Sequence, residues 1–367
     1  MDAATRIDLF VREVGHPSPV IIGPGVLQDV GAFLPPDARR AFLVSDARVL
    51  RLHGAAVGRR LAACGMNVDA IPFPPGEASK ARKMLARIQD RILGSRPDRE
   101  SIVVALGGGV TTDLAGLAAA SLLRGMPLLN LPTTVVGVVD AAIGGKCGVD
   151  TRHGKNLVGA FHWPLAVVAD TDLLATLPAP EVRAGLSEMV KCGVVGDPGL
   201  LDAIEADVGR LAAGDMPAAS LLARAAAVKV AVVQADPLER GVRRTLNFGH
   251  TVGHAIESAT DFLVGHGAAV AAGMIVEARI AQRVAGFSPS GTARIARVLR
   301  DLGLPVAPPC TFEDARPFLP ADKKALGGHQ RMALPEAIGV MAAAGGAFVI
   351  AVPEALVREC WQGVDAT

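Results

Sequence analysis

The sequence predicts two domains: an α/β domain built on a parallel sheet, and after it a mainly α-helical domain. At 367 residues the chain is longer than most single domains. Its first half alternates short β-branched runs with amphipathic stretches, the pattern of a parallel sheet covered by helices. From about Leu173 the β-branched runs give way to long alanine-rich stretches. We therefore expect domains at residues 1–174 and 175–367.

Four apolar runs in the first half are expected to be strands of this sheet. "RAFLVSD" ends at Ser45 and Asp46, "SIVVALGGG" runs into three glycines, and "LLNLPTT" and "LAVVADT" follow. "TTDLAGLAAASLL" and a stretch ending in "LGSRP" have helical periodicity and are expected to lie between the strands as helices.

The second half is expected to be helical almost to its end. "LLARAAAVKVAVVQAD" and "GAAVAAGMIVEARIAQRVAG" are typical helix formers. The apolar run at 337–352, "AIGVMAAAGGAFVIAV", is shorter than the roughly 18 residues of a membrane span. A Gly-Gly pair interrupts it, so we expect two short strands joined by a turn.

Charge and cysteine content exclude several classes of protein. The formal net charge is +1, so no basic excess is available to neutralise nucleic acid phosphates. The five cysteines lack metal-site spacing and suit free thiols in a reducing compartment. The N-terminal "MDAATRIDLF" has no apolar signal-peptide segment. We expect a soluble cytoplasmic protein with no nucleic acid or membrane partner.

A glycine-rich turn indicates an anion site. In "VVALGGGVTTDLAG" a strand, three glycines (Gly107, Gly108 and Gly109) and a helix follow one another. The glycines allow close backbone approach, and a helix N-terminus favours negative charge. Thr111 or Thr112 is expected to cap the helix. The alternative is a plain tight turn, but strand ends in such sheets are where dinucleotides bind.

Three of the eight histidines lie together in "RRTLNFGHTVGHAIESATDFLVGHGAAVAAGM", residues 243–274. His250 and His254 are four apart and share one face of a predicted helix, and His266 follows a turn. Zinc commonly takes two or three imidazoles and a carboxylate, with one position open. The pattern therefore predicts that two of these histidines and a carboxylate bind a metal.

Spacing alone does not identify that carboxylate. Glu188 lies in "AGLSEMVKCG", three residues before Lys191 and on the same helix face. Glu257 and Asp261 are nearer to the histidines in the chain. All three remain candidates at this point.

Five blocks resemble those of 3-dehydroquinate synthase and related sugar phosphate cyclases, in order from about residue 20 to 350. They are "GGGVTTDLAG", "RGMPLLNLPTTVVGVVDAAIGGKCGVD", "GKNLVGAFHWP", "LPAPEVRAGLSEMVK" and "LNFGHTVGHAIE" with "HGAAVAAGM". The resemblance implies a Rossmann-like NAD-binding domain and a helical domain enclosing a site with zinc, or cobalt in its place. It implies a phosphate-eliminating lyase of the shikimate pathway of aromatic amino acid biosynthesis, acting as a homodimer.

The resemblance also implies roles for individual residues. The metal ligands would be Glu188, His250 and His266, while His254 would contact the substrate phosphate. The catalytic residues would be Lys146, Lys191, Glu239, His254 and Asp140. The substrate-binding residues would be Arg124, Asn156, Lys229, Arg243, Asn247, Lys323 and Lys324, with Arg124 reaching a neighbouring subunit. NAD would be bound by Asp46, Glu77, Lys80, Gly108, Gly109, Asp113, Thr133, Thr134, Lys155 and Thr176.

The substrate implied is 3-deoxy-arabino-heptulosonate 7-phosphate or its amino analogue. Arg243 and Asn247 stand where family members handle a substrate carboxylate, and arginine binds carboxylates in a bidentate manner. Thr112, Pro237 and Ala268 differ from the residues usual at these positions in the family. These differences are compatible with an enzyme of specialised metabolism. The alternatives are an aminodehydroquinate synthase, a sedoheptulose 7-phosphate cyclase giving a valiolone-type cyclitol, a metal-dependent polyol dehydrogenase of similar architecture, and a silent binding protein.

Overall fold

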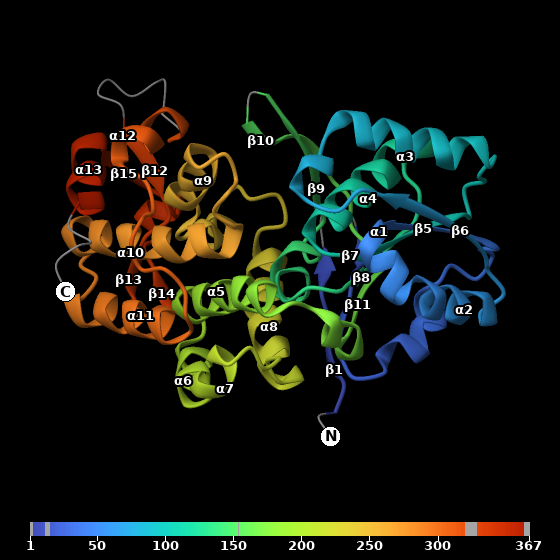
Figure 1. Ribbon diagram of the computed structural model, residues 1–367, viewed down its shortest axis with the longest axis horizontal. Helices are drawn as coiled ribbons and strands as arrows, with labels where there is room; N and C mark the ends of the chain where they lie inside the picture. Colours follow the sequence, from blue (N-terminus) through green and yellow to red (C-terminus); the bar gives the residue numbers. More distant parts are fainter. Residues whose placement is uncertain (1–2, 12–14, 153, 320–328, 363–367) are drawn as a thin grey trace. The chain divides into compact units, whose positions relative to one another are not determined.

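A computed structural model describes residues 3–11, 15–152, 154–319 and 329–362 (Figure 1). The chain divides into two compact units, Met1–Leu177 with Ala218–Gln234, and Pro178–Pro217 with Ala235–Thr367. The domain boundary after residue 174 stays a prediction. The compact units differ from it chiefly because residues 218–234 group with the N-terminal unit.

A seven-stranded sheet forms the N-terminal unit. In spatial order its strands are β1 (Thr5–Ile7), β4 (Val20–Gly23), β11 (Ala166–Asp170), β8 (Leu128–Pro132), β7 (Ile102–Gly107), β5 (Arg40–Asp46) and β6 (Asn67–Phe73). All neighbours are parallel except β1 and β4. The four strands expected from apolar runs are β5, β7, β8 and β11, which confirms them.

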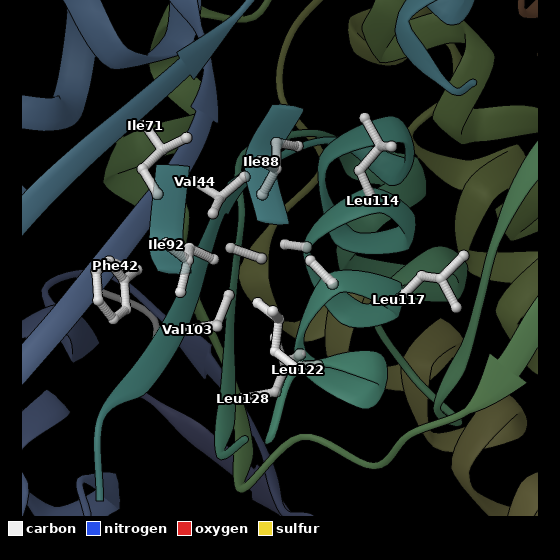
Figure 2. Packing of buried hydrophobic residues seen from close by; sticks show 14 of the residues in the cluster. Phe42, Val44, Ile71, Ile88, Ile92, Val103, Leu114, Leu117, Leu122 and Leu128 are labelled. Carbon is white, nitrogen blue, oxygen red and sulfur yellow. The ribbon is translucent and has the colours of Figure 1, made fainter. Parts of the chain in front are cut away.

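Helices cover both faces of this sheet, as in a Rossmann-like domain. They are α1 (Ala47–Val49), α2 (Ala55–Ala63), α3 (Arg82–Gly94) and α4 (Gly109–Ser121). All but the last residue of α8 (Ala219–Ala235) also groups with this unit. Phe42 of β5 lies in one buried cluster with Ile88 of α3 and Leu114 of α4 (Figure 2). The next residue, Leu43, lies in a second cluster with Leu61 of α2. Successive strand residues point to opposite faces, so both faces carry apolar cores.

Shorter elements complete the N-terminal unit. They are β2 (Phe10–Val11), β3 (His16–Pro17), β9 (Lys146–Thr151), β10 (Gly154–Phe161), and the short 3₁₀ or π helices η2 (Val26–Phe33), η3 (Leu50–Gly54), η4 (Glu77–Ser79), η5 (Leu122–Arg124), η6 (Gly137–Ala141) and η7 (Thr171–Thr176). β9 and β10 form an antiparallel hairpin, and β9 packs against α4.

The second unit is mainly helical, as predicted. Its helices are α5 (Ala179–Val195), α6 (Pro198–Ala206), α7 (Val208–Ala212), α9 (His250–Ala259), α10 (His266–Val284), α11 (Pro289–Asp301), α12 (Phe312–Ala315) and α13 (Glu354–Gln362), with turns η8 (Val242–Asn247), η9 (Arg316–Phe318) and η10 (Ala344–Gly346). α10 packs against α5, α9, α11 and α13, and most of its residues are buried. Its small side chains allow this close packing on several sides. No helix in the described ranges is long and apolar enough to cross a bilayer.

The run at 337–352 does not form the expected hairpin. It contains β14 (Val340–Met341) and most of β15 (Ile350–Pro353), but these two strands do not pair with each other. β14 pairs with β13 (Pro335–Ala337), and β15 pairs with β12 (His329–Met332). The prediction of two strands is right and that of their pairing is wrong, because β12 precedes the run and β13 ends on its first residue.

Candidate functional site

Glu188 and Lys191 form a buried ion pair on α5. Pro178 and Pro180 begin this helix, where a missing backbone N–H costs nothing. Lys191 Nζ lies 2.5 Å from Glu188 Oε2, and the two side chains are 1% and 0% exposed. A carboxylate this deeply buried requires positive charge or hydrogen bond donors around it. Further cationic groups are therefore expected near Glu188.

Two histidines lie beside this carboxylate. His250 is the first residue of α9 and His266 the first of α10. Their Nε2 atoms lie 3.6 Å and 3.2 Å from Glu188 Oε1. One potential ligand atom from each of the three residues lies within 4.8 Å of the others. The structure thus brings together the three residues that the family resemblance names as metal ligands.

The second nitrogen of each ring also has a partner. His250 Nδ1 lies 3.2 Å from the carbonyl oxygen of Phe248, which orients an Nδ1–H toward that oxygen. His266 Nδ1 lies 3.4 Å from Glu257 Oε2. Metal-binding histidines usually donate their other N–H to a carbonyl or carboxylate in this way. Both rings therefore direct Nε2 toward Glu188, while Nδ1 is held by another group. This leaves Nε2 as the nitrogen that would bind a cation.

The charge state of the histidines also fits a cation site. Burial and, after it, nearby Lys191 lower the pKa of His250 to about 3, so this imidazole is neutral. Burial also lowers the pKa of His266, but hydrogen bonds with Glu188 and Glu257 outweigh burial and raise it to about 10. Without a metal, a proton on His266 therefore balances the negative charge of Glu188 and Glu257. A bound metal cation would balance the same charge in its place.

His254 lies beside this group, with its ring centroid 5.3 Å from that of His250, but it is more exposed. Its Nε2 is 4.0 Å from Glu257 Oε2, and its side chain is 43% exposed, against 11% for His250. A second set of possible ligands, His254, Glu257 and His266, shares His266 with the first. The first set is the better candidate for a metal site, because it includes a fully buried carboxylate next to a neutral imidazole. Asp261 belongs to neither set and is exposed.

Arg243 belongs to a separate polar cluster in the second unit. It lies in η8 and is 1% exposed. Its guanidinium donates to the carbonyl of Pro237, and its backbone N–H donates to Asp236 Oδ2 at 3.0 Å. Asn247 Nδ2 donates to Glu239 Oε1 at 3.1 Å. The segment from Asp236 to Asn247 therefore holds three of the predicted residues, Glu239, Arg243 and Asn247.

The glycine turn lies at the carboxyl edge of the sheet. β7 ends at Gly107, and α4 begins at Gly109 after Gly108 in extended conformation. A Cβ at Gly108 would lie 2.9 Å from Thr134 Cγ2, so only glycine allows this approach. The capping prediction for Thr111 or Thr112 is wrong: α4 has no side-chain cap, and Thr112 Oγ1 donates to the carbonyl of Gly109.

This edge is also where the strand order reverses. The chain runs from β5 to β6 on one side, and then to β7 on the other side of β5. Ligands of open α/β sheets bind outside the carboxyl ends of the strands at such a point. Asp46 ends β5, and its carboxylate accepts the backbone N–H groups of Arg48 and Val49 at 2.9 Å.

Lys80 and Asp113 form an ion pair in the N-terminal unit. Lys80 Nζ lies 2.5 Å from Asp113 Oδ2, with side-chain exposures of 8% and 18%. Burial raises the pKa of Asp113 to about 6 against the opposing effect of the lysine. Both residues were predicted to bind NAD, and the structure joins them although 33 positions separate them.

The other predicted residues of this unit lie as follows. Lys229 Nζ is 2.6 Å from Asp140 Oδ1, and Lys155 Nζ is 3.1 Å from Glu77 Oε1. Thr176 Oγ1 is 2.8 Å from His53 Nε2, a partner that the sequence did not suggest. Thr133 is buried, and Arg124, Lys146 and Asn156 are exposed. Lys323 and Lys324 lie outside the described residues.

Glu277 is a buried acid that sequence reasoning missed. It lies on α10 with no exposed surface, and it accepts backbone N–H groups from Gly249 at 2.7 Å and Val252 at 3.0 Å. Burial raises its pKa to about 8, although these donors favour the charged form. A single charge within the apolar "GMIVEARIA" was the available signal.

The raised pKa of Glu277 predicts a pH effect on stability. An acid whose pKa is higher folded than unfolded binds more protons in the folded state between the two values. Between about pH 4.5 and pH 8, Glu277 should therefore lower the free energy of unfolding by up to about 1.4 kcal/mol per pH unit as pH rises. Urea unfolding of metal-free wild type and Glu277→Gln across this range checks it. A difference between the two proteins that does not change with pH would contradict the prediction.

Sequence models of one family match most of the chain. The model described as 3-dehydroquinate synthase N-terminal matches residues 70–184, and that described as 3-dehydroquinate synthase C-terminal matches residues 185–325. A 3-dehydroquinate synthase of Symbiobacterium thermophilum is 44% identical over 326 residues, which are 86% of this chain and 90% of that protein.

Two solved structures of other cyclases resemble the whole chain. A 2-deoxy-scyllo-inosose synthase complexed with carbaglucose-6-phosphate, NAD⁺ and Co²⁺ has a TM-score of 0.86 at 26% identity, covering 98% of this chain and 100% of its own. A 2-epi-5-epi-valiolone synthase of Streptomyces hygroscopicus with NAD⁺ and Zn²⁺ bound has a TM-score of 0.83 at 29% identity, covering 95% and 96%.

Proposed function

The chain belongs to the 3-dehydroquinate synthase family, and on that premise we propose that it converts 3-deoxy-arabino-heptulosonate 7-phosphate to 3-dehydroquinate and phosphate. The sequence of reactions is oxidation of a hydroxyl group, elimination of phosphate, return of the hydride, ring opening and intramolecular aldol addition. The hydride is returned, so NAD is not consumed. This makes the protein a phosphate-eliminating lyase that requires NAD and a divalent metal. The two cyclase structures contain NAD⁺ together with Co²⁺ or Zn²⁺.

The buried group of Glu188, His250 and His266 is the observation that carries this proposal. Its carboxylate and two oriented imidazoles are the donor set of a catalytic zinc site, with cobalt able to replace zinc. When bound, the metal polarises substrate oxygens and so makes the neighbouring C–H more acidic. Lys191 neutralises the remaining Glu188 oxygen, and His254, which is partly exposed beside the group, would exchange protons with the substrate.

The remaining residues of the second unit suit an anionic substrate. Arg243 would bind the substrate carboxylate in a bidentate manner, and Asn247 would add a neutral hydrogen bond beside Glu239. In a dehydrogenase acting on a neutral polyol, a guanidinium at this position would have no substrate charge to pair with. It also favours a heptulosonate over sedoheptulose 7-phosphate, which has no carboxylate.

The N-terminal unit would bind NAD at the carboxyl edge of its sheet. Gly108 and Gly109 would let the pyrophosphate reach the start of α4, while Asp46, Asp113 and Lys80 lie at or near the ends of neighbouring strands. NAD supplies the hydride acceptor. The paired Lys229 and Asp140 and the exposed Asn156, Lys146 and Arg124 would serve a phosphorylated substrate. In the same proposal the protein is a cytoplasmic homodimer, in which Arg124 reaches the neighbouring subunit.

Phosphate release in the presence of NAD and zinc tests the function. We expect release with 3-deoxy-arabino-heptulosonate 7-phosphate and no accumulation of NADH, because the hydride is returned. The matched comparison is sedoheptulose 7-phosphate under the same conditions. Turnover of that sugar alone would move the protein to a cyclitol-forming reaction. Net NADH formation without phosphate release would instead identify a dehydrogenase.

A further inference from the structure

The buried carboxyl group of Glu277 lies against the start of α9. Its two oxygens accept different backbone N–H groups, with Oε2 bound to Gly249 at 2.7 Å and Oε1 to Val252 at 3.0 Å. Thr251 contributes a third backbone hydrogen bond. These three residues surround His250, the first residue of α9. The acid therefore holds the backbone on both sides of a proposed metal ligand.

The start of α9 depends on this acid because its own sequence offers no cap. The first N–H groups of a helix have no partner within the helix. The residue before α9 is Gly249, in left-handed conformation with φ of 81°, and no side chain caps the helix. Glu277 takes the place of such a cap from α10, because its two oxygens accept backbone N–H groups at the start of α9.

Glycines bring the two helices close enough for this contact. A Cβ at Gly273 of α10 would lie 2.1 Å from the carbonyl oxygen of Gly249. A Cβ at Gly253 of α9 would lie 3.1 Å from the Cα of Val270. The backbones of α9 and α10 thus touch around His250. At this distance the short side chain of Glu277 reaches the first turn of α9 without help from water.

We propose that Glu277 is a positioning residue for the metal site, fixing the start of α9 so that His250 Nε2 points at Glu188. His250 is already held through Nδ1 by the carbonyl of Phe248. With Glu277 in place, the backbone and the ring are fixed by separate hydrogen bonds. Without it, the first turn of α9 loses its cap and the imidazole loses its fixed direction. This inference rests on the proposed function of Glu188, His250 and His266 as metal ligands.

The test is the affinity of the full-length protein for Co²⁺, measured by competition with a chromophoric chelator, together with the visible absorption of the bound ion. Glu277→Gln replaces one accepting oxygen by an NH₂ group, which cannot accept a hydrogen bond from the backbone N–H that it faces. We expect its dissociation constant to rise about 10-fold, with a changed cobalt spectrum. The control is Ile280→Val, which removes one buried methylene from the same helix without touching α9 hydrogen bonds. It should retain the affinity and spectrum of wild type.

The outcomes separate a positioning role from a merely structural one. If Glu277→Gln binds Co²⁺ with unchanged affinity and spectrum while its melting temperature falls, the inference is overturned. If Glu277→Gln does not fold, Glu277→Asp keeps the carboxyl group but withdraws its oxygens from α9, and the same loss of affinity is expected of it. Unchanged affinity there also overturns the inference. Failure of wild type to bind Co²⁺ would instead refute the metal site itself.

Discussion

Replacing His250 with alanine should abolish tight zinc binding and with it phosphate release. His250 is a neutral imidazole whose Nε2 lies 3.6 Å from Glu188 Oε1, so its loss leaves only one carboxylate and one imidazole for the metal. Metal binding contributes several kcal/mol to stabilising the charge that develops during the reaction. We therefore expect turnover to fall by about 1,000-fold or more. Zinc content after gel filtration and the rate of phosphate release are the measurements.

His254→Ala is the matched control for this prediction. His254 lies one helical turn further along α9, and its Nε2 is 4.0 Å from Glu257 Oε2. This variant should retain zinc and lose most of its turnover, because the lost group serves the substrate and not the metal. Equal loss of zinc in both variants would show that the second set of residues, with Glu257, binds the metal.

Arg243→Ala should lower kcat/KM for the carboxylate substrate. Arg243 is 1% exposed, so a bound carboxylate would meet it away from water. Removing one partner of a buried charge pair costs about 2–5 kcal/mol, which corresponds to a roughly 30- to 4,000-fold loss of catalytic efficiency. Arg243→Lys should recover only part of it, because an ammonium group cannot form the bidentate contact. Steady-state phosphate release at varied substrate concentration measures both variants.

Arg244→Ala provides the comparison for folding and net charge. Arg244 is the next residue in η8, and its guanidinium donates to the carbonyl of Ala347 at 3.2 Å. It has the same charge as Arg243 but no proposed substrate contact, so its kcat/KM should stay near that of wild type. If Arg243→Ala had the same kcat/KM as Arg244→Ala, either another residue would bind the substrate carboxylate or the true substrate would have no carboxylate.

Local patterns in the sequence predicted most of the α/β fold. β5, β7, β8 and β11 are short apolar runs, and both faces of β5 are covered, so a continuous apolar sequence was sufficient to identify it. The pairing at 337–352 was not predictable in the same way. β14 and β15 are only two and four residues long, and their partners depend on how the preceding chain packs.

The candidate site was predicted in its chemistry more than in its arrangement. The histidine spacing indicated a metal site but left Glu188, Glu257 and Asp261 as alternatives. The structure places Glu188 at the Nε2 side of His266 and Glu257 at its Nδ1 side, so the two acids have different relations to the ring. Sequence distance could not show this, because α5 and α10 meet through packing.

By itself the sequence determined the two kinds of domain, the glycine turn after a buried strand, and the clustered histidines on one helix face. These features depend on residues that are neighbours in the chain, where periodicity and backbone freedom act locally. Only the tertiary structure decided which distant groups meet: Lys80 with Asp113, Lys229 with Asp140, and Glu277 with the start of α9. Each of these contacts satisfies a buried charge from another element, and which partner it finds is settled by how the elements pack.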